Sequence, residues 1–314
     1  MRGTHVLMLF LDGVGIGVRD PAVNPLFAAR LPALRSLFHG ELPSLRQRAL
    51  TAAGATLIPL DATLGVPGLP QSGTGQTALF TGVNGAALIG RHFGPHPYST
   101  LKPVIEEKNI FRQVLEAGKS PCFANAFPRR FFEYVEQRRS RLSVTTYSCK
   151  AAGVPLRTGT ELEQGTGVSA DITGEGWRTL GHPETKIITP SEAGRRLVRL
   201  SSQHEFVLFE YWKPDHAGHA MDRAEAIAVM ESFDGLLAGI LGTIDPARTL
   251  LVITSDHGNI EDITVKTHTR HPVPLIVRGH GHGEFVEWLS RSERGGADLT
   301  AVTPAIMQVI HRGF

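Results

Sequence analysis

The sequence has few cysteines and no long apolar run. Cys122 and Cys149 are its only cysteines, too few for a disulfide framework in a chain of 314 residues, so we expect a reducing, cytoplasmic location. The N-terminal run VLMLFL is six residues long and is followed by Asp12. A membrane helix needs about 20 apolar residues. The run therefore predicts a strand, and we expect neither a signal peptide nor contact with a membrane.

The sequence also lacks an excess of charge of either sign. It has 32 basic and 30 acidic residues, a formal net charge of +2. This balance gives no indication of a nucleic-acid or membrane surface, so we expect a small-molecule partner and no nucleic acid. Hydrophobic residues make up 41% of the chain, enough to bury a full core. We therefore expect a large globular α/β domain.

A buried strand near the C-terminus ends in candidate metal ligands. The apolar and β-branched run from Leu250 to Thr254 is too short for a helix and is followed by the turn-prone residues SDHGN. Asp256 and His257 therefore lie at the carboxyl end of a strand, where α/β sheets place their ligands. A carboxylate beside an imidazole is suited to a divalent metal. Considered alone, the pair could equally belong to a capped turn.

A second strand of this kind lies at the N-terminus. The run from His5 to Leu11 predicts a buried strand that delivers Asp12 into the glycine-rich turn LDGVGIG. Asp12 is therefore a further candidate ligand. The following apolar pattern from Pro25 to Phe38 predicts one short helix packed on the sheet.

The segment LPQSGTGQTALFTG predicts a helix that begins close to Ser72. The positive end of a helix dipole favours an anion at that point. A serine placed there can act as a nucleophile if a metal lowers the pKa of its hydroxyl. The alternative is an ordinary N-cap, because serine is a favoured capping residue.

Two later segments supply more candidate ligands. Asp215 and His219 follow the predicted strand 206–211 and are four residues apart, which places both side chains on one face of a helix. His268 and His271 precede another apolar strand, and one of them would complete a metal site.

Residues 128–186 differ in character from the rest of the chain. They open with PRRFFEYVEQRRSR, which contains Arg129, Arg130, Arg138, Arg139 and Arg141, and continue without clear periodicity. We interpret 128–186 as a small inserted cap and 1–127 with 187–314 as the metal-binding core. The arginines form either a solvated helix face or a clamp for the anionic or polar end of a substrate.

Together these segments resemble the alkaline phosphatase superfamily. QSGTGQTALFTG resembles its nucleophile segment, and LDGVGIG, LKP at 101–103, SDHGN and HTRHPVPLIV most resemble the phosphopentomutase and cofactor-independent phosphoglycerate mutase branch. The resemblance implies an α/β three-layer sandwich with a mostly parallel sheet and a small inserted cap. It implies two divalent ions, manganese or zinc.

The resemblance also assigns roles to individual residues. It implies a first ion held by Asp215, His219 and His268, and a second held by Asp12, Asp256 and His257, with Ser72 as nucleophile and further ligand. Arg129, Arg130 and His271 are candidate substrate contacts.

The sequence leaves three functions open. The main hypothesis is a metal-dependent phosphomonoesterase or phosphodiesterase that works through a phosphoserine. The second is a phosphomutase acting on a sugar phosphate or phosphoglycerate. Only VNGAALI separates Gly82 from Gly90, where phosphopentomutases insert a substrate-binding domain, and this favours hydrolysis. The third is a non-catalytic metal-binding protein on the same fold.

Overall fold

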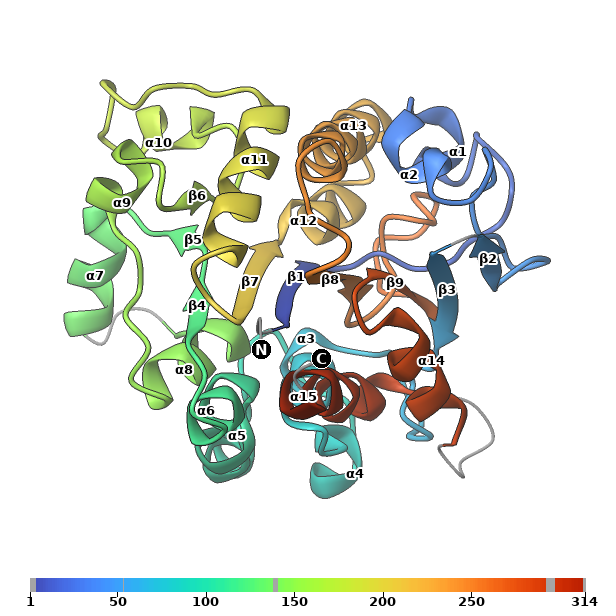
Figure 1. The fold of residues 1–314 in the computed structure, drawn as a ribbon. Coiled ribbons are helices and arrows are strands. Elements are labelled where there is room, and N and C mark those ends of the chain that lie inside the picture. Colours follow the sequence, from blue (N-terminus) through green and yellow to red (C-terminus); the bar gives the residue numbers. More distant parts are fainter. Residues whose placement is uncertain (1–3, 53, 138–140, 292–296, 313–314) are drawn as a thin grey trace.

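The centre of the fold is a seven-stranded sheet, seen edge-on in Figure 1. The computed structural model describes residues 4–52, 54–137, 141–291 and 297–312. Across the sheet the strands lie in the order β2 (Leu50–Ala52), β3 (Ala55–Leu60), β9 (Val273–Gly279), β8 (Thr249–Ser255), β1 (His5–Leu11), β7 (Phe206–Tyr211) and β4 (Pro121–Phe123). The expected strands 5–11, 206–211 and 250–254 are confirmed.

The sheet is mostly parallel, as expected. Strands β8, β1, β7 and β4 pair in parallel, whereas β9 is antiparallel to both β8 and β3. Every residue of β7 and β8 is buried, which explains why these strands are continuous apolar runs rather than alternating patterns. The carboxyl ends of the parallel strands and the amino end of β9 therefore share one edge of the sheet.

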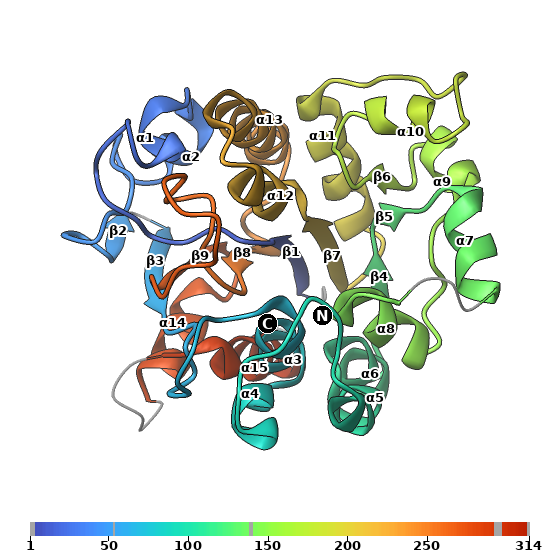
Figure 2. The same ribbon diagram turned by 180° about the vertical axis from the view of Figure 1, so that it is seen from behind.

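Helices cover both faces of the sheet (Figures 1 and 2). Leu7, Leu9 and Leu11 of β1 join one apolar cluster, and Val6 and Met8 join the other. The first face carries α1 (Pro25–Ala28), α2 (Pro32–Ser36), α11 (Pro190–Ser201), α12 (Lys213–Ala220) and α13 (Arg223–Leu241). The second carries α3 (Ser72–Thr81), α4 (Gly85–Ile89), α5 (Lys102–Lys108), α6 (Ile110–Glu116), α8 (Val144–Ala151), α14 (His282–Ser290) and α15 (Val302–Arg312). The three-layer α/β architecture is confirmed.

The prediction of one helix over residues 25–38 is wrong, because the structure has two short helices there. The first, α1, ends at Ala28, and α2 begins at Pro32. Proline has no amide hydrogen and disfavours a helical conformation in the residue before it, so the chain breaks at Leu31 and restarts with Pro32 at the first helical position.

The segment 128–186 contains four helices and one short strand among its described residues. These are α7 (Arg129–Glu136), α8, α9 (Gly159–Glu163), α10 (Glu175–Thr179) and β6 (Val168–Ser169), which pairs with β5 (Asn125–Ala126). Val144 and Cys149 of α8 lie in the same apolar cluster as Val6 and Met8 of β1, so part of this segment packs into the main core. The cap boundary stays a prediction. Arg138 and Arg139 lie outside the described residues.

Within the described ranges, we find no helix that is long and apolar enough to cross a membrane.

Candidate metal centre

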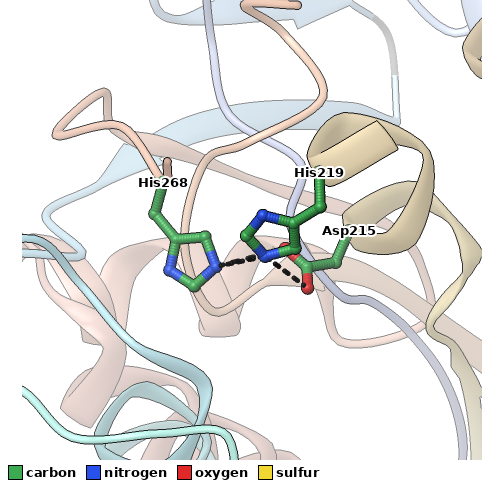
Figure 3. A group of neighbouring side chains, drawn as sticks. All are labelled: Asp215, His219 and His268. Atoms are coloured by element: carbon green, nitrogen blue, oxygen red, sulfur yellow. Dashed lines mark hydrogen bonds and ion pairs between the residues drawn. The ribbon is translucent and has the colours of Figure 1, made fainter. Parts of the chain in front are cut away.

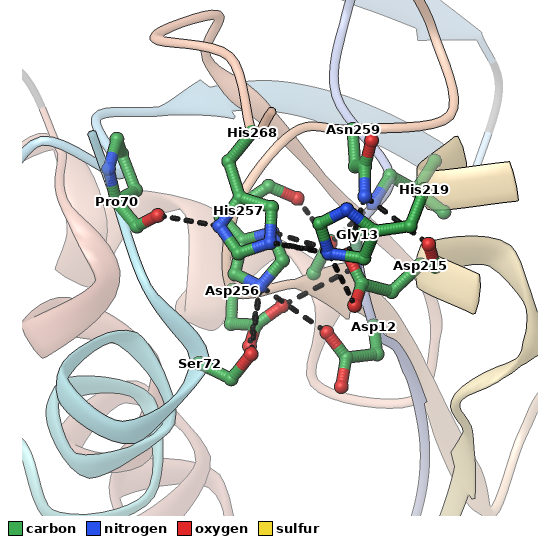
Figure 4. Close-up of polar contacts among 12 residues, drawn as sticks. Asp12, Gly13, Pro70, Ser72, Asp215, His219, Asp256, His257, Asn259 and His268 are labelled. Atoms are coloured by element: carbon green, nitrogen blue, oxygen red, sulfur yellow. Dashed lines mark hydrogen bonds and ion pairs between the residues drawn. The ribbon is translucent and has the colours of Figure 1, made fainter. Parts of the chain in front are cut away.

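Side chains from four parts of the chain meet at one edge of the sheet (Figure 4). Asp12 follows β1, and Asp256 and His257 follow β8 directly. Asp215 lies in the first turn of α12, just after β7. His268 precedes β9, whose antiparallel direction puts its amino end at the same edge.

Glycines allow these segments to approach closely. Gly13 has a φ of +76°, and a Cβ atom placed on it would lie 2.7 Å from the Cα atom of Asp215. A Cβ atom on Gly75 would lie 2.8 Å from the carbonyl oxygen of Asp256. The glycines that follow Asp12 and Ser72 in the sequence therefore let α12 and the loop after β8 lie against them.

The first group of ligand atoms comes from Asp215, His219 and His268 (Figure 3). The two histidine Nε2 atoms are 3.1 Å apart. Asp215 Oδ2 lies 3.4 Å from His219 Nε2, and Asp215 Oδ1 lies 3.4 Å from His268 Nε2. Three ligand atoms that converge from α12 and from the loop before β9 can hold one divalent ion.

Both histidines of this group are fixed through their other ring nitrogen. His219 Nδ1 lies 2.8 Å from the carbonyl oxygen of Lys266, and His268 Nδ1 lies 2.7 Å from that of Pro70. A carbonyl can only accept, so Nδ1 carries the hydrogen in each ring. The Nε2 lone pairs are then directed at each other and at Asp215, which suits metal ligation.

The second group surrounds His257. Its Nε2 atom lies 2.9 Å from Ser72 Oγ, 3.3 Å from Asp12 Oδ1 and 3.5 Å from Asp256 Oδ2. Ligand atoms of Asp12, Asp215 and His257 also lie within 4.8 Å of one another. Asp215 thus lies between the two groups. All seven residues implied as ligands are brought together.

Ser72 is the first residue of α3, and Gln71 is the residue before the helix. The serine is buried, and its hydroxyl is paired with His257 instead of capping α3. The N-cap alternative therefore does not describe this serine.

The charges of the site favour a bound cation. Burial raises the pKa of Asp12, and burial together with the charge of Asp12 raises the pKa of Asp256 to about 7. Burial would lower the pKa of His257, but the charges of Asp256, Asp12 and Asp215 raise it to about 10. Burial opposes ionisation of Asp215, yet its hydrogen bond with His268 and the charge of His257 hold its pKa below the usual range.

These residues fit divalent ions. Asp12 Oδ1 is buried and has no hydrogen-bond partner, which is costly for a carboxylate oxygen unless a cation faces it. Three carboxylates and three imidazoles supply oxygen and nitrogen ligands of the kind that manganese and zinc accept.

Several supporting residues escaped the sequence analysis. Gln76 Nε2 donates to Asp12 Oδ2 at 3.3 Å and to Asp256 Oδ2 at 3.1 Å. Asn259 Nδ2 donates to Asp215 Oδ1 at 2.7 Å. Both residues lie in the segments that carry candidate ligands: Gln76 is four positions after Ser72, and Asn259 is three positions after Asp256. An amide side chain this close to a candidate ligand is the sequence feature that could have identified them.

Glu261 is a further residue that the sequence analysis missed. It is fully buried, and its Oε2 accepts hydrogen bonds from the backbone N–H groups of Gly15 and Asn259, each at 2.8 Å. Its Oε1 accepts from Thr269 Oγ1 and from His271 Nδ1. Glu261 thereby joins the three loops that carry the candidate ligands.

Glu210 is a second buried acid next to the site. It interrupts the apolar strand β7, and this interruption was the sequence signal. Burial and the charge of Asp12 raise its pKa to about 8, against a hydrogen bond with Thr145 that lowers it.

Within the described chain, three predicted substrate contacts lie apart from the seven ligands. Arg129 Nε bonds Glu133 Oε1 at 2.9 Å, and Arg130 lies over the ring of Tyr134 with its Cζ 5.0 Å from the centroid. Both pairs lie within α7, which has no buried residue. His271 is paired with Glu261. A role for these three in substrate binding stays a prediction.

Comparison of sequences relates the chain to metalloenzymes. A family model described as the Metalloenzyme superfamily matches residues 184–311. The cofactor-independent phosphoglycerate mutase of Thermomicrobium roseum is 33% identical over 118 residues, 35% of this chain and 22% of the relative. That of Moorella thermoacetica is 30% identical over 144 residues, 41% of this chain and 26% of the relative. The chain thus spans about a quarter of the length of these curated relatives.

Solved structures share the fold across the whole chain. The PH0037 protein from Pyrococcus horikoshii is 15% identical with a TM-score of 0.60, over 100% of this chain and 98% of the other. Alkaline phosphatase from the Antarctic bacterium TAB5 is 14% identical with a TM-score of 0.53, over 100% of both chains. The Leishmania mexicana phosphoglycerate mutase has 13% identity and a TM-score of 0.50, over 99% and 96%.

The family model, the phosphoglycerate mutase relatives and the shared fold agree with one another and with the ligand groups at the sheet edge. The chain is thus similar to the Metalloenzyme superfamily over residues 184–311, and it shares its fold with alkaline phosphatase.

Proposed function

We propose that the protein is a metal-dependent phosphohydrolase that cleaves a small phosphomonoester or phosphodiester through a phosphoserine at Ser72. The observation that carries this proposal is the position of Ser72. Its hydroxyl lies 2.9 Å from His257 Nε2, at the start of α3 and beside both ligand groups.

The chain's own groups supply binding and positioning for this reaction. The positive end of the α3 dipole attracts the phosphate to Ser72. The serine oxygen attacks phosphorus, the ester P–O bond breaks and the alcohol leaves. Water then attacks the phosphoserine, which releases phosphate and restores the hydroxyl.

Two divalent ions, manganese or zinc, would be held by the two ligand groups. When bound, such ions would lower the pKa of the serine hydroxyl and of water, and they would neutralise charge on the phosphate. The buried Asp12 oxygen without a hydrogen-bond partner and the shared position of Asp215 support a pair of ions at this edge.

A phosphomutase is the second candidate. It is favoured by the similarity to phosphoglycerate mutases. A mutase must retain its dephosphorylated intermediate until a second hydroxyl is presented, which requires an enclosed site. In the fully described stretch 54–137, helix α4 follows α3 almost at once, and no domain is inserted between Gly82 and Gly90. This connection supports hydrolysis over mutase action.

The test is a panel of phosphomonoesters, phosphodiesters, sugar phosphates and phosphoglycerates. Metal-free protein is reconstituted separately with Mn²⁺ and with Zn²⁺, and free phosphate, the alcohol released from each ester and isomerised product are measured. Metal-dependent phosphate release supports the proposal. Isomerised product without phosphate would support the mutase, and bound metal without any turnover would support a non-catalytic metal-binding protein.

A further inference from the structure

A cavity of about 490 Å³ lies beside the candidate centre, between residues 93–99, the start of α5 and α8. Its walls include three aromatic residues, two basic residues and one aliphatic residue: Phe93, Tyr98, Tyr147, His96, Lys102 and Leu142. Small-molecule sites usually enclose about 300–1,000 Å³, so the cavity has room for one small ligand.

One wall of the cavity is joined to the residues that follow Ser72. Thr74 N–H donates to the carbonyl oxygen of Phe93 at 2.9 Å, and Phe93 N–H donates to Thr74 Oγ1 at 3.2 Å. A Cβ atom on Gly73 would lie 2.4 Å from the carbonyl oxygen of His96. The segment from Phe93 to His96 therefore lies directly against the first turn of α3.

The opposite wall is joined to the same centre through α8. Tyr147 of this helix lines the cavity, and α8 packs against α3, the helix that begins at Ser72. Two separate structural connections thus place the cavity next to the reacting groups.

The lining combines flat apolar surfaces with basic groups. The rings of Phe93 and Tyr98 pack edge to face with centroids 4.8 Å apart, and Lys102 Nζ lies 5.5 Å from the centroid of the Tyr147 ring. Nδ1 of His96 is buried without a hydrogen-bond partner. No carboxylate lines the cavity among the described residues. Such a lining suits a ligand with a ring or other apolar body and a negative charge.

We propose that this cavity binds the alcohol portion of the substrate, and that the substrate is a phosphoester whose alcohol joins an apolar ring to a second anionic group. The phosphate lies at Ser72, the ring lies against the aromatic wall, and the second anion is paired with Lys102. This inference rests on the proposed hydrolase function, because it assigns the cavity to the substrate of that reaction.

The test compares 4-carboxybenzyl phosphate with benzyl phosphate. The two esters have similar leaving groups and differ in the second anion. We expect metal-reconstituted protein to prefer the carboxylated ester in kcat/KM by about tenfold, as for a hydrogen bond to a charged group. Lys102→Gln should reduce this preference to near unity. Lys108→Gln, at the far end of α5, is the matched control and should keep it.

The outcomes separate this inference from the proposed function. Phosphate release without preference between the esters, or a preference that survives Lys102→Gln, overturns the cavity assignment and leaves the hydrolase intact. If neither ester is cleaved, the hydrolase is decided by the substrate panel above, and calorimetry with the alcohol 4-(hydroxymethyl)benzoate tests the cavity directly. Binding that is weakened by Lys102→Gln supports the cavity, and no binding overturns it.

Discussion

The imidazole rings of His257 and His268 are stacked, with centroids 3.8 Å apart and planes inclined by 17°. His257 comes from the loop after β8 and His268 from the loop before β9, so the stack joins the two ligand groups across adjacent strands. Two protonated imidazoles at this distance would repel each other. The stack therefore disfavours a state in which both rings carry a charge.

The first prediction follows from the shared position of Asp215. Because Asp215 contributes to both ligand groups, Asp215→Ala should lose most of the bound metal at both positions, whereas His219→Ala should lose mainly one ion. Metal content per protein after dialysis, measured by mass spectrometry, checks this. Equal losses in the two variants would contradict a bridging position for Asp215.

The second prediction concerns the nucleophile. Ser72→Ala removes the only atom we assign to attack phosphorus, so turnover should fall by about 10³-fold or more. The carboxylates and imidazoles remain, so metal content should stay close to that of the unchanged protein. Ser290→Ala, on the exposed face of α14, is the control and should keep full turnover. Undiminished turnover in Ser72→Ala would remove Ser72 from the mechanism.

The sequence was sufficient to place the candidate carboxylate and imidazole ligands at one sheet edge, because they follow or precede strongly apolar strands. Asp12, Asp256 and His257 stand directly after β1 and β8, and strand ends in α/β sheets converge on one edge. The family resemblance favoured His268 over His271, and the structure directs His268 at His219 and His271 at Glu261. That choice depends on hydrogen bonds across the fold, such as the one between His268 Nδ1 and Pro70.

The roles of Glu210 and Glu261, and the position of Asp215 between the two ligand groups, were beyond the sequence for a related reason. A buried carboxylate acquires its function from the groups that face it, and these come from distant segments. Glu261, for example, receives hydrogen bonds from residues 15 and 269. The break at Pro32 is different, because the restriction that proline imposes on the preceding residue is local and could have been predicted.

The third prediction is a pH dependence of the metal-free protein. Glu210 has an ordinary pKa of 4.5, which the fold raises to about 8. The folded protein holds this proton where the unfolded chain releases it, so the stabilising contribution is complete below pH 4.5 and is lost as the pH rises through about 8. Asp256, raised from 3.8 to about 7, acts in the same direction at lower pH.

Urea unfolding in the presence of a chelator should therefore show stability falling between pH about 5 and about 8, by up to about 1.4 kcal/mol per pH unit for each proton. Glu210→Gln should flatten the upper part of this slope. Added Mn²⁺ or Zn²⁺ should flatten the slope in the unchanged protein, because a bound cation favours the ionised carboxylates. A slope unaffected by Glu210→Gln would show that Glu210 is not the group that titrates.

The last prediction concerns Glu261, which holds the loops after β1 and β8 and before β9 in one arrangement. Glu261→Gln keeps the shape of the side chain but turns one acceptor oxygen into an amide that can only donate. Either the backbone N–H groups of Gly15 and Asn259 or the hydroxyl of Thr269 then lose their acceptor in a fully buried site. Each unpaired buried group costs about 1–3 kcal/mol, so we expect a loss of about 3 kcal/mol in the free energy of unfolding.

Because the same loops carry Asp12, His257 and His268, metal affinity should also fall, by about 10- to 100-fold. Glu287→Gln, on the exposed face of α14, controls for the change of charge and should alter neither quantity. A Glu261→Gln protein with unchanged stability and metal affinity would show that the loops hold the ligands in place without this carboxylate.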